Sequence, residues 1–178
     1  MQKWKSCAMV DAYIGLGSNL GNRRSWLVSA ILQLQPLGTL VAVSSLWESE
    51  PIGGPQQQDW YLNMAARLCT PLAAHPLLDA LFAIEQNLGR VRTIKNGPRT
   101  IDLDLLVWGN LTLQDDRLIL PHPRMAARRF VLEPLAEVHP NPQAIVGMDF
   151  YRAMDQVKDQ RLYCLGSIDD GSPMDQSL

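Results

Sequence analysis

An apolar run that contains two aspartates places the strongest constraint on how this chain folds. Residues 101–108 read Ile-Asp-Leu-Asp-Leu-Leu-Val-Trp, a pattern that predicts a buried strand. Side chains alternate across a strand, so we expect Asp102 and Asp104 on one face, about 7 Å apart by the strand rise. Two such carboxylates raise each other's pKa unless cations neutralise them. Because an apolar strand has no structural use for this pair, we expect the strand to border a polar site.

The segment just before this strand supplies cations around a Gly97-Pro98 break: Arg90, Arg92, Lys95 and Arg99. Mg²⁺ is typically held by one or two carboxylates together with substrate phosphates. Arginines then take up the charge that develops on phosphate oxygens in the transition state. Each feature alone is a weak signal, since Asp-x-Asp and Arg-x-Arg are more often structural or solvated. Their conjunction predicts a phosphoryl-transfer site.

Composition narrows the class of protein further. The chain has 178 residues, of which 47% are hydrophobic, which suits one globular domain with a sizeable core. The net charge of −2 lacks the basic signature of nucleic-acid or membrane-surface binding. Three cysteines without metal-ligand spacing indicate reduced thiols, and no apolar stretch reaches transmembrane length. We expect a cytoplasmic monomer that binds neither nucleic acid nor membrane.

The order of elements predicts the fold class. Apolar patterns indicate strands over 10–16, 39–47, 60–68 and 101–108, and helices over 26–34 and 76–88. This β-α-β-β-α-β order predicts an α+β, ferredoxin-like sandwich, with helices on one face of a mostly antiparallel sheet. We expect its first and last strands to be central, which would bring the glycine turn after the first strand close to the aspartates. Residues 130–138 predict a helix among C-terminal additions.

The same reading divides the chain into three parts. We expect an N-terminal extension over residues 1–9, a folded domain over 10–165 and a disordered tail over 166–178, where the composition turns to Gly, Ser, Pro and Asp.

Two smaller motifs leave alternatives open. Residues 15–21 read Gly-Leu-Gly-Ser-Asn-Leu-Gly; a dinucleotide fingerprint would need glycine at Leu20, so a tight turn with Ser18, Asn19 or Asn22 near a helix N-cap is favoured over phosphate binding. Tyr61 and Asn63 share one strand face. They are either a flat binding surface for a heterocycle or, taken alone, a core tyrosine and a strand-edge asparagine.

With these residues in place, the chain resembles the 6-hydroxymethyl-7,8-dihydropterin pyrophosphokinase family of folate biosynthesis. The central match is Lys95-x-Gly97-Pro98-Arg99-x-x-Asp102-Leu103-Asp104-Leu105-Leu106. The glycine turn, Tyr61-Leu62-Asn63, Gly89-Arg90-Val91-Arg92 and Pro121-His122 also match in the expected order. The resemblance extends from about Val10 to Val138.

The resemblance implies a reaction and roles for particular residues. The family transfers the pyrophosphoryl unit of ATP to the pterin hydroxymethyl group and releases AMP. Asp102 and Asp104 would hold two Mg²⁺ ions, and Arg90 and Arg99 would act on the phosphates during catalysis. Tyr61 and Phe130 would stack on the pterin, Asn63 would read its edge, and Ser49 and Ile52 would complete that pocket. The expected ATP-binding residues are Glu85, Arg92, Arg117, His122 and Arg128.

Some positions depart from the family pattern, and other classes compete with this reading. Asn96 stands where some members carry a tryptophan over the pterin, and Pro123 where some carry an aromatic residue. We expect residues 92–98 to be mobile and to close over the substrates. The competing classes are a nucleotidyl transferase or cyclase of the polymerase-palm type, which would release pyrophosphate, and a ligand-binding module without catalysis.

Overall fold

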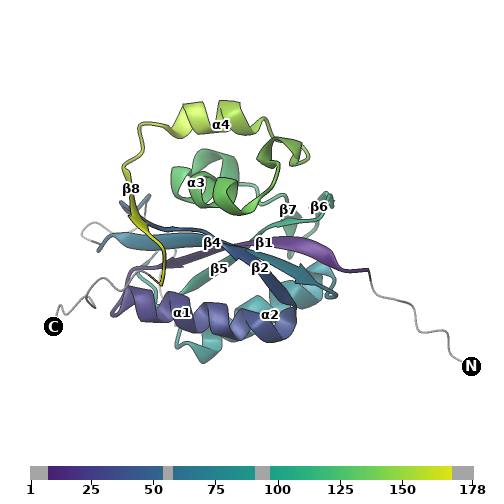
Figure 1. The fold of residues 1–178 in the computed structure, drawn as a ribbon, viewed down its shortest axis with the longest axis horizontal. Coiled ribbons are helices and arrows are strands. Elements are labelled where there is room, and N and C mark those ends of the chain that lie inside the picture. The colour runs from purple at the N-terminus through teal and green to yellow at the C-terminus, as the bar shows by residue number, and fades with distance from the viewer. Residues whose placement is uncertain (1–7, 54–57, 91–96, 170–178) are drawn as a thin grey trace, which may run out of the picture.

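A six-stranded antiparallel sheet lies between two pairs of helices in the computed structural model, which describes residues 8–53, 58–90 and 97–169. Helices α1 (Arg23–Leu34) and α2 (Ala74–Asn87) cover one face of the sheet, and α3 (Arg129–Val138) and α4 (Phe150–Val157) cover the other (Figure 1). The prediction that helices lie on one face only is therefore wrong. Within the described ranges, no helix is long and apolar enough to span a membrane.

The sheet has the strand order β5-β1-β4-β3-β8, and β2 pairs with β4 as well. The strands are β1 (Val10–Ser18), β2 (Thr39–Val43), β3 (Leu46–Ser49), β4 (Tyr61–Thr70), β5 (Asp102–Trp108) and β8 (Leu162–Gly166). The strand expected over 39–47 is thus two strands, which pair with different parts of β4. β1 is central as predicted, but β5 is an edge strand. It still lies beside β1, so the glycine turn and the aspartates are close.

Two hydrophobic clusters, one on each face, hold the layers together. Leu27 of α1 and Leu77 of α2 belong to the first cluster, while Leu132 of α3 and Phe150 of α4 belong to the second. The central strands β1 and β4 contribute to both clusters because side chains alternate across a strand. This is why both strands are buried along most of their length rather than on one side only.

Local signals set the ends of the first two helices. Asn22 caps α1 by accepting a hydrogen bond from Ser25 N at 3.0 Å, as the sequence predicts. Gly89 follows α2 with φ of +74°, the left-handed conformation that glycine adopts readily after a helix. α2 begins at Ala74, two residues before the start that Pro76 predicts.

The C-terminal part adds the remaining elements. A small hairpin of β6 (Leu113–Gln114) and β7 (Ile119–Leu120) precedes α3, and short 3-10 turns cover Gln35–Leu37, Met125–Ala127 and Pro142–Ala144. Gly166 closes β8, and Arg24 donates hydrogen bonds to the carbonyls of Ser167 and Ile168. The folded domain therefore extends beyond residue 165, through the start of the predicted tail; residues 170–178 lie outside the described residues.

Candidate active site

One pocket gathers most of the predicted site residues. It lies on the sheet face covered by α3, over β1, β4 and β5. The predicted residues that line it are Ser49, Ile52, Tyr61, Asn63, Arg99, Asp102, Asp104, Arg128 and Phe130. Residues predicted for metal, phosphate and pterin thus meet in one hollow, although they come from four separate segments of the chain.

Glycines form the floor of this pocket. In the strand register Gly17 lies between Asp102 on one side and Asn63 on the other, and Gly15 lies opposite Asp104. Directly opposite residues point to the same face of a sheet, so both glycines share the face of the carboxylates and the amide. A Cβ atom on Gly17 would lie 3.4 Å from Asn63 Oδ1. The absence of side chains at these two positions leaves room between the carboxylate side and the amide side.

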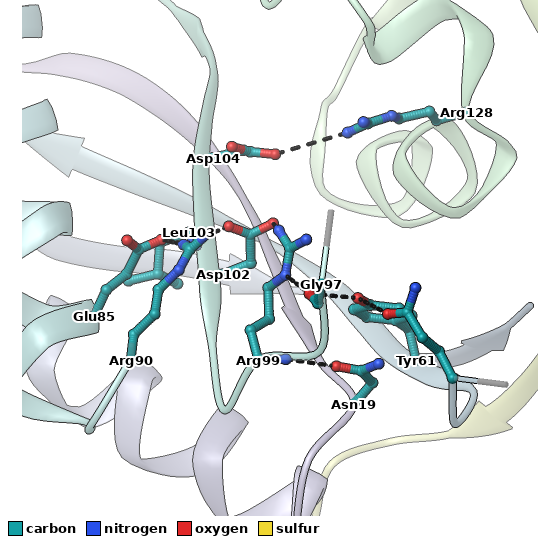
Figure 2. Close-up of polar contacts among 11 residues, drawn as sticks. Asn19, Tyr61, Glu85, Arg90, Gly97, Arg99, Asp102, Leu103, Asp104 and Arg128 are labelled. Atoms are coloured by element: carbon teal, nitrogen blue, oxygen red, sulfur yellow. Dashed lines mark hydrogen bonds and ion pairs between the residues drawn. The ribbon is translucent and has the colours of Figure 1, made fainter. Parts of the chain in front are cut away.

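Asp102 is held between two arginines (Figure 2). Arg90 Nη1 lies 2.5 Å from one carboxylate oxygen, and Arg99 Nη1 lies 2.6 Å from the other. Arg90 also forms an ion pair with Glu85. Glu85 is only 2% exposed and accepts a hydrogen bond from Leu103 N at 2.8 Å. A buried carboxylate on α2 therefore connects that helix to β5 and orients one of the two arginines.

Asp104 has a looser environment than Asp102. Its nearest described cation is Arg128, whose Nη1 lies 3.9 Å from Asp104 Oδ2, at the outer limit of an ion pair. Burial first, and then the charge of Asp102, raise the pKa of Asp104 to about 6, against the opposing effect of Arg128 and Arg124. A third of the Asp104 side-chain surface nevertheless remains open to the pocket. Because burial disfavours the ionised form of Asp104, a cation bound beside it would stabilise that form.

The glycine turn holds the arginine loop in place. Asn19, which is 1% exposed, accepts a hydrogen bond from Arg99 N at 2.8 Å through Oδ1, and its own N donates to Arg99 O at 3.1 Å. Arg99 Nε donates to Gly97 O at 3.1 Å. β1 extends through Ser18, so only the second half of residues 15–21 forms the predicted turn; its asparagine has a structural role, and its target is the loop that carries Arg99.

The opposite side of the pocket carries an amide and two aromatic rings. Asn63 is 4% exposed, and its Nδ2 donates to Ser49 Oγ at 2.9 Å. The guanidinium of Arg99 lies 5.9 Å from the ring centroid of Tyr61, and that of Arg128 lies 5.6 Å from that of Phe130. Two aromatic rings and a fixed amide are the groups that would bind a flat, polar-edged heterocycle.

Other predicted residues lie around this pocket or away from it. His122 follows β7, where its backbone N donates to Leu106 O at 2.8 Å; burial first, then the positive charges of Arg128 and Arg124, lower its pKa to about 4. Arg117 is 57% exposed at its side chain and pairs with Asp79 of α2. Neither is among the pocket-lining residues in the described part of the chain. Arg92, like most of the loop predicted to be mobile, lies outside the described residues.

Several other residues line the pocket, and sequence reasoning had not assigned them to it. Gly15 and Gly17 were read as part of a turn, although glycines at i and i+2 in a strand were a usable signal for a hollow surface. Arg124 lines the pocket beside Arg128, and the basic segment 124–129 was the clue to it. Glu50, which pairs with Arg161 at 2.7 Å, lies between Ser49 and Ile52, which the resemblance already placed around the pterin.

The same fold occurs in solved structures. Two crystal structures of Plasmodium falciparum HPPK-DHPS superpose with TM-scores of 0.66 and 0.64, at 12% and 14% sequence identity. They cover 86% and 87% of this chain, which spans less than half, 46%, of each of those chains. At such low identity the likeness shows the fold class: a mixed α/β protein with an antiparallel sheet and HPPK structural neighbours.

Sequence comparison identifies the family. Residues 13–140 match the profile of the 7,8-dihydro-6-hydroxymethylpterin-pyrophosphokinase (HPPK) family, and the chain belongs to this family. A Pseudomonas aeruginosa relative is 47% identical over 131 residues, which cover 72% of this chain and 80% of the relative. A Bacillus subtilis relative is 44% identical over 129 residues, 71% of this chain and 77% of the relative. Both are named 2-amino-4-hydroxy-6-hydroxymethyldihydropteridine pyrophosphokinase.

Proposed function

We propose that this chain transfers the pyrophosphoryl group of ATP to 6-hydroxymethyl-7,8-dihydropterin, giving the pterin diphosphate and AMP in folate biosynthesis. Membership of the HPPK family supports the reaction. The observation that carries it at the level of the site is the glycine-floored pocket. It sets Asp102 and Asp104 on one side and Asn63 and Tyr61 on the other, as a transfer between a polyphosphate and a heterocycle requires.

The carboxylate pair fits Mg²⁺. Asp102 and Asp104 share one face of β5, and burial first, then the charge of Asp102, raise the pKa of Asp104, so a cation beside the pair would stabilise its ionised form. Two carboxylates with access to substrate phosphates are the donor set that Mg²⁺ ordinarily uses. We infer that these two residues hold the metal, two ions in the family pattern. Bound there, Mg²⁺ would neutralise phosphate charge and acidify the attacking hydroxyl.

The arginines would change partners when substrate binds. Arg90 and Arg99 occupy both oxygens of Asp102 in this structure. Phosphate oxygens are equally good acceptors for a guanidinium fork. We infer that both arginines contact phosphates in the complex, Arg90 oriented by Glu85 and Arg99 by the Asn19 turn. This assigns Glu85 a positioning role rather than the direct contact with ATP that the resemblance implies.

Recognition of the pterin would depend on the shape of the pocket and on one side-chain amide. Asn63 presents a fixed amide because Ser49 holds its Nδ2, so it would read the polar edge of the heterocycle with little loss of entropy. Tyr61 and Phe130 would stack on its two faces, and Ile52, half-exposed at the pocket mouth, would close the side. We infer that Arg128, His122, Arg117 and Arg92 serve the nucleotide.

The arrangement of the core also supports the ferredoxin-like assignment. The sheet runs β5-β1-β4, and β2 and β3 pair with different parts of β4; each of these pairs is antiparallel. This order follows the split βαβ pattern, in which β2 and β3 together take the place of one strand and α1 and α2 are the two helices. We infer this arrangement for residues 10–108, with α3, α4 and β8 as additions that build the second face.

Identification of the nucleotide product tests the proposal. The protein is incubated with ATP, Mg²⁺ and 6-hydroxymethyl-7,8-dihydropterin, and the expected products are AMP and the pterin diphosphate. ADP, or pyrophosphate released from ATP without pterin, would overturn it. Asp104→Asn is expected to abolish turnover, whereas the matched change Asp116→Asn, at an exposed position between β6 and β7, is expected to leave it intact.

A further inference from the structure

The beginning of α3 lacks a cap of the usual kind. Its N-cap residue is Arg128, with φ of −132° and ψ of 105°. A guanidinium carries only donors, so Arg128 cannot accept a hydrogen bond from the first turn as Ser, Thr, Asp or Asn would. The Arg128 side chain lies in the pocket instead, 19% exposed and facing Asp104.

Gln160 supplies the missing acceptor from a distant part of the chain. Its Oε1 accepts a hydrogen bond from Arg129 N at 2.8 Å, and its Nε2 donates to Ala127 O at 2.9 Å. These two backbone groups belong to the peptide units on either side of Arg128. One side-chain amide therefore holds the backbone of Arg128 from both directions, in the extended conformation that such a paired contact requires.

The segment that carries Gln160 is itself held against α3. Gln160 N donates to Val157 O at 3.0 Å at the end of α4. Arg129 Nη1 donates to Gln160 O at 3.1 Å and to Lys158 O at 2.9 Å, while its Nε pairs with Glu133 at 3.0 Å. The contact is reciprocal, since each segment donates to and accepts from the other. Gln160 is half-buried in this contact rather than a freely rotating surface residue.

We propose that Gln160 is a positioning residue of the active site, which clamps the backbone of Arg128 and thereby aims Arg128 at Asp104 and the substrate. The inference rests on the proposed function for the identity of that substrate. A shift of the Arg128 backbone would move its guanidinium, which lies 3.9 Å from Asp104 and 5.6 Å from the Phe130 ring. Gln160 lies beyond residues 13–140, the part that matches the family.

Direct binding measurements test this role without relying on turnover. The probe is Mg²⁺ with α,β-methylene-ATP. It resists transfer because a methylene group replaces the oxygen between the α- and β-phosphates, where the bond would break. Gln160→Met keeps the size of the side chain but removes both hydrogen bonds. We expect the Kd of the probe to rise about 5- to 10-fold, the effect of one to two net hydrogen bonds. We expect Gln160→Glu, which keeps the acceptor for Arg129 N, to show a smaller rise.

Two further variants separate positioning from general stabilisation. Gln143→Met removes an equivalent cap, since Gln143 Oε1 accepts from Phe150 N at 3.1 Å at the start of α4, away from the pocket lining; its Kd is expected to match the wild type. In an Arg128→Ala background, Gln160→Met should produce no further rise, because the two residues act through one contact.

Three outcomes would overturn the proposal: an unchanged Kd in Gln160→Met, an equal rise in Gln143→Met, or the full rise persisting without the Arg128 side chain. Steady-state kinetics give an independent check, with the KM for ATP expected to rise more than kcat falls. Failure of the proposed function is distinguishable, because it appears as a wild-type protein that binds the probe and forms no AMP.

Discussion

Asp102 in this structure has the two arginines as partners, whereas the proposed reaction gives it a metal ion. Both of its oxygens accept from a guanidinium, at 2.5 and 2.6 Å, so its charge is balanced before any substrate arrives. We interpret the arginines as partners that Asp102 would exchange for a metal ion when phosphate binds. Since phosphate binding would draw them away from Asp102, substrate and metal would be expected to bind cooperatively.

Arg99 is expected to act mainly on the transition state. Its guanidinium group is held by Asp102 and by Gly97 O. In the proposed reaction, negative charge would grow on nearby phosphate oxygens as AMP leaves. Arg99→Ala should therefore lower kcat by about 10²- to 10³-fold, the scale for losing one preorganised donor, with little change in the KM for ATP. Steady-state kinetics measure both constants.

The controls for Arg99 follow from its geometry. Arg99→Lys should restore only part of kcat, because a point charge does not reproduce the fork. Arg152→Ala, at an exposed position on α4, should behave as the wild type. If Arg99→Ala weakens ATP binding and leaves kcat intact, Arg99 is a docking residue.

His122 is expected to make stability depend on pH. Burial, together with the charges of Arg128 and Arg124, lowers the pKa of His122 to about 4, below the ordinary value near 6.5. Its Nδ1 accepts from Arg124 N at 3.2 Å, which also requires the neutral ring. A depressed folded-state pKa stabilises the protein above about pH 6.5, and this contribution is lost as pH falls toward 4.

The variant His122→Asn isolates that contribution, because its Oδ1 can replace Nδ1 as acceptor without titrating. The free energy of unfolding should fall more steeply in the wild type than in the variant between pH 6.5 and 4, by on the order of 2–4 kcal/mol in total. Chemical denaturation at a series of pH values measures this difference. Parallel curves for the two proteins would show that the ring is not buried in its neutral form.

At the scale of elements, close backbone approach explains why a glycine stands at position 38. Gly38 joins the turn after α1 to β2, and a Cβ atom there would lie 2.3 Å from Cys69 O and 3.0 Å from Thr70 Cα. Its φ of 164° is ordinary extended backbone, so the constraint is steric. The obstructing atoms belong to β4, whose Cys69 pairs with Thr39 in the sheet.

Gly38→Ala is therefore expected to disturb the pairing of β2 with β4. We expect a loss of about 3 kcal/mol or more in the free energy of unfolding, at the upper end of overpacking costs because backbone must move. Gly147→Ala is the matched control: its φ is +75°, but no atom lies within 4 Å of the added Cβ, so a cost of about 1 kcal/mol is expected. Equal costs in urea denaturation would refute the steric argument.

At the scale of the whole molecule, the two ends of the chain differ in what they contribute. β1 begins at Val10, and residues 1–7 lie outside the described residues. At the other end, Phe150, Ala153 and Val157 of α4 are buried in the second hydrophobic cluster. The C-terminal additions therefore complete a core, and Gln160 binds the backbone on either side of Arg128.

Two truncations test this difference. A chain that begins at Met9 should keep normal turnover and lose less than about 1 kcal/mol of stability, the centre of ordinary point-mutant effects. A chain that ends after Pro140 should lose far more, because it leaves the α3 face of the second cluster uncovered. A large loss in the first case would show that the extension packs on the domain. Light scattering on the full chain would test the prediction of a monomer.

Much of the site could be predicted from the sequence because its chemistry is local. The alternation within residues 101–108 places Asp102 and Asp104 together, and the spacing of Tyr61 and Asn63 places them on one face, since a strand repeats every two residues. Asn22 and Gly89 mark helix ends because capping depends on neighbouring backbone groups. The match to the HPPK family covers residues 13–140, which include these segments.

Tertiary structure decided what depends on contacts between distant segments. The register of β1 against β4 and β5 puts Gly15 and Gly17 between the carboxylates and the amide, and strand periodicity does not specify register. Contacts between distant segments also determine the second helical layer, the burial of Glu85 beneath Arg90 and the hydrogen bonds of Gln160 with the peptides around Arg128. Periodicity reports which side of an element is buried, whereas its partner is selected by packing and hydrogen-bond satisfaction summed over the whole fold.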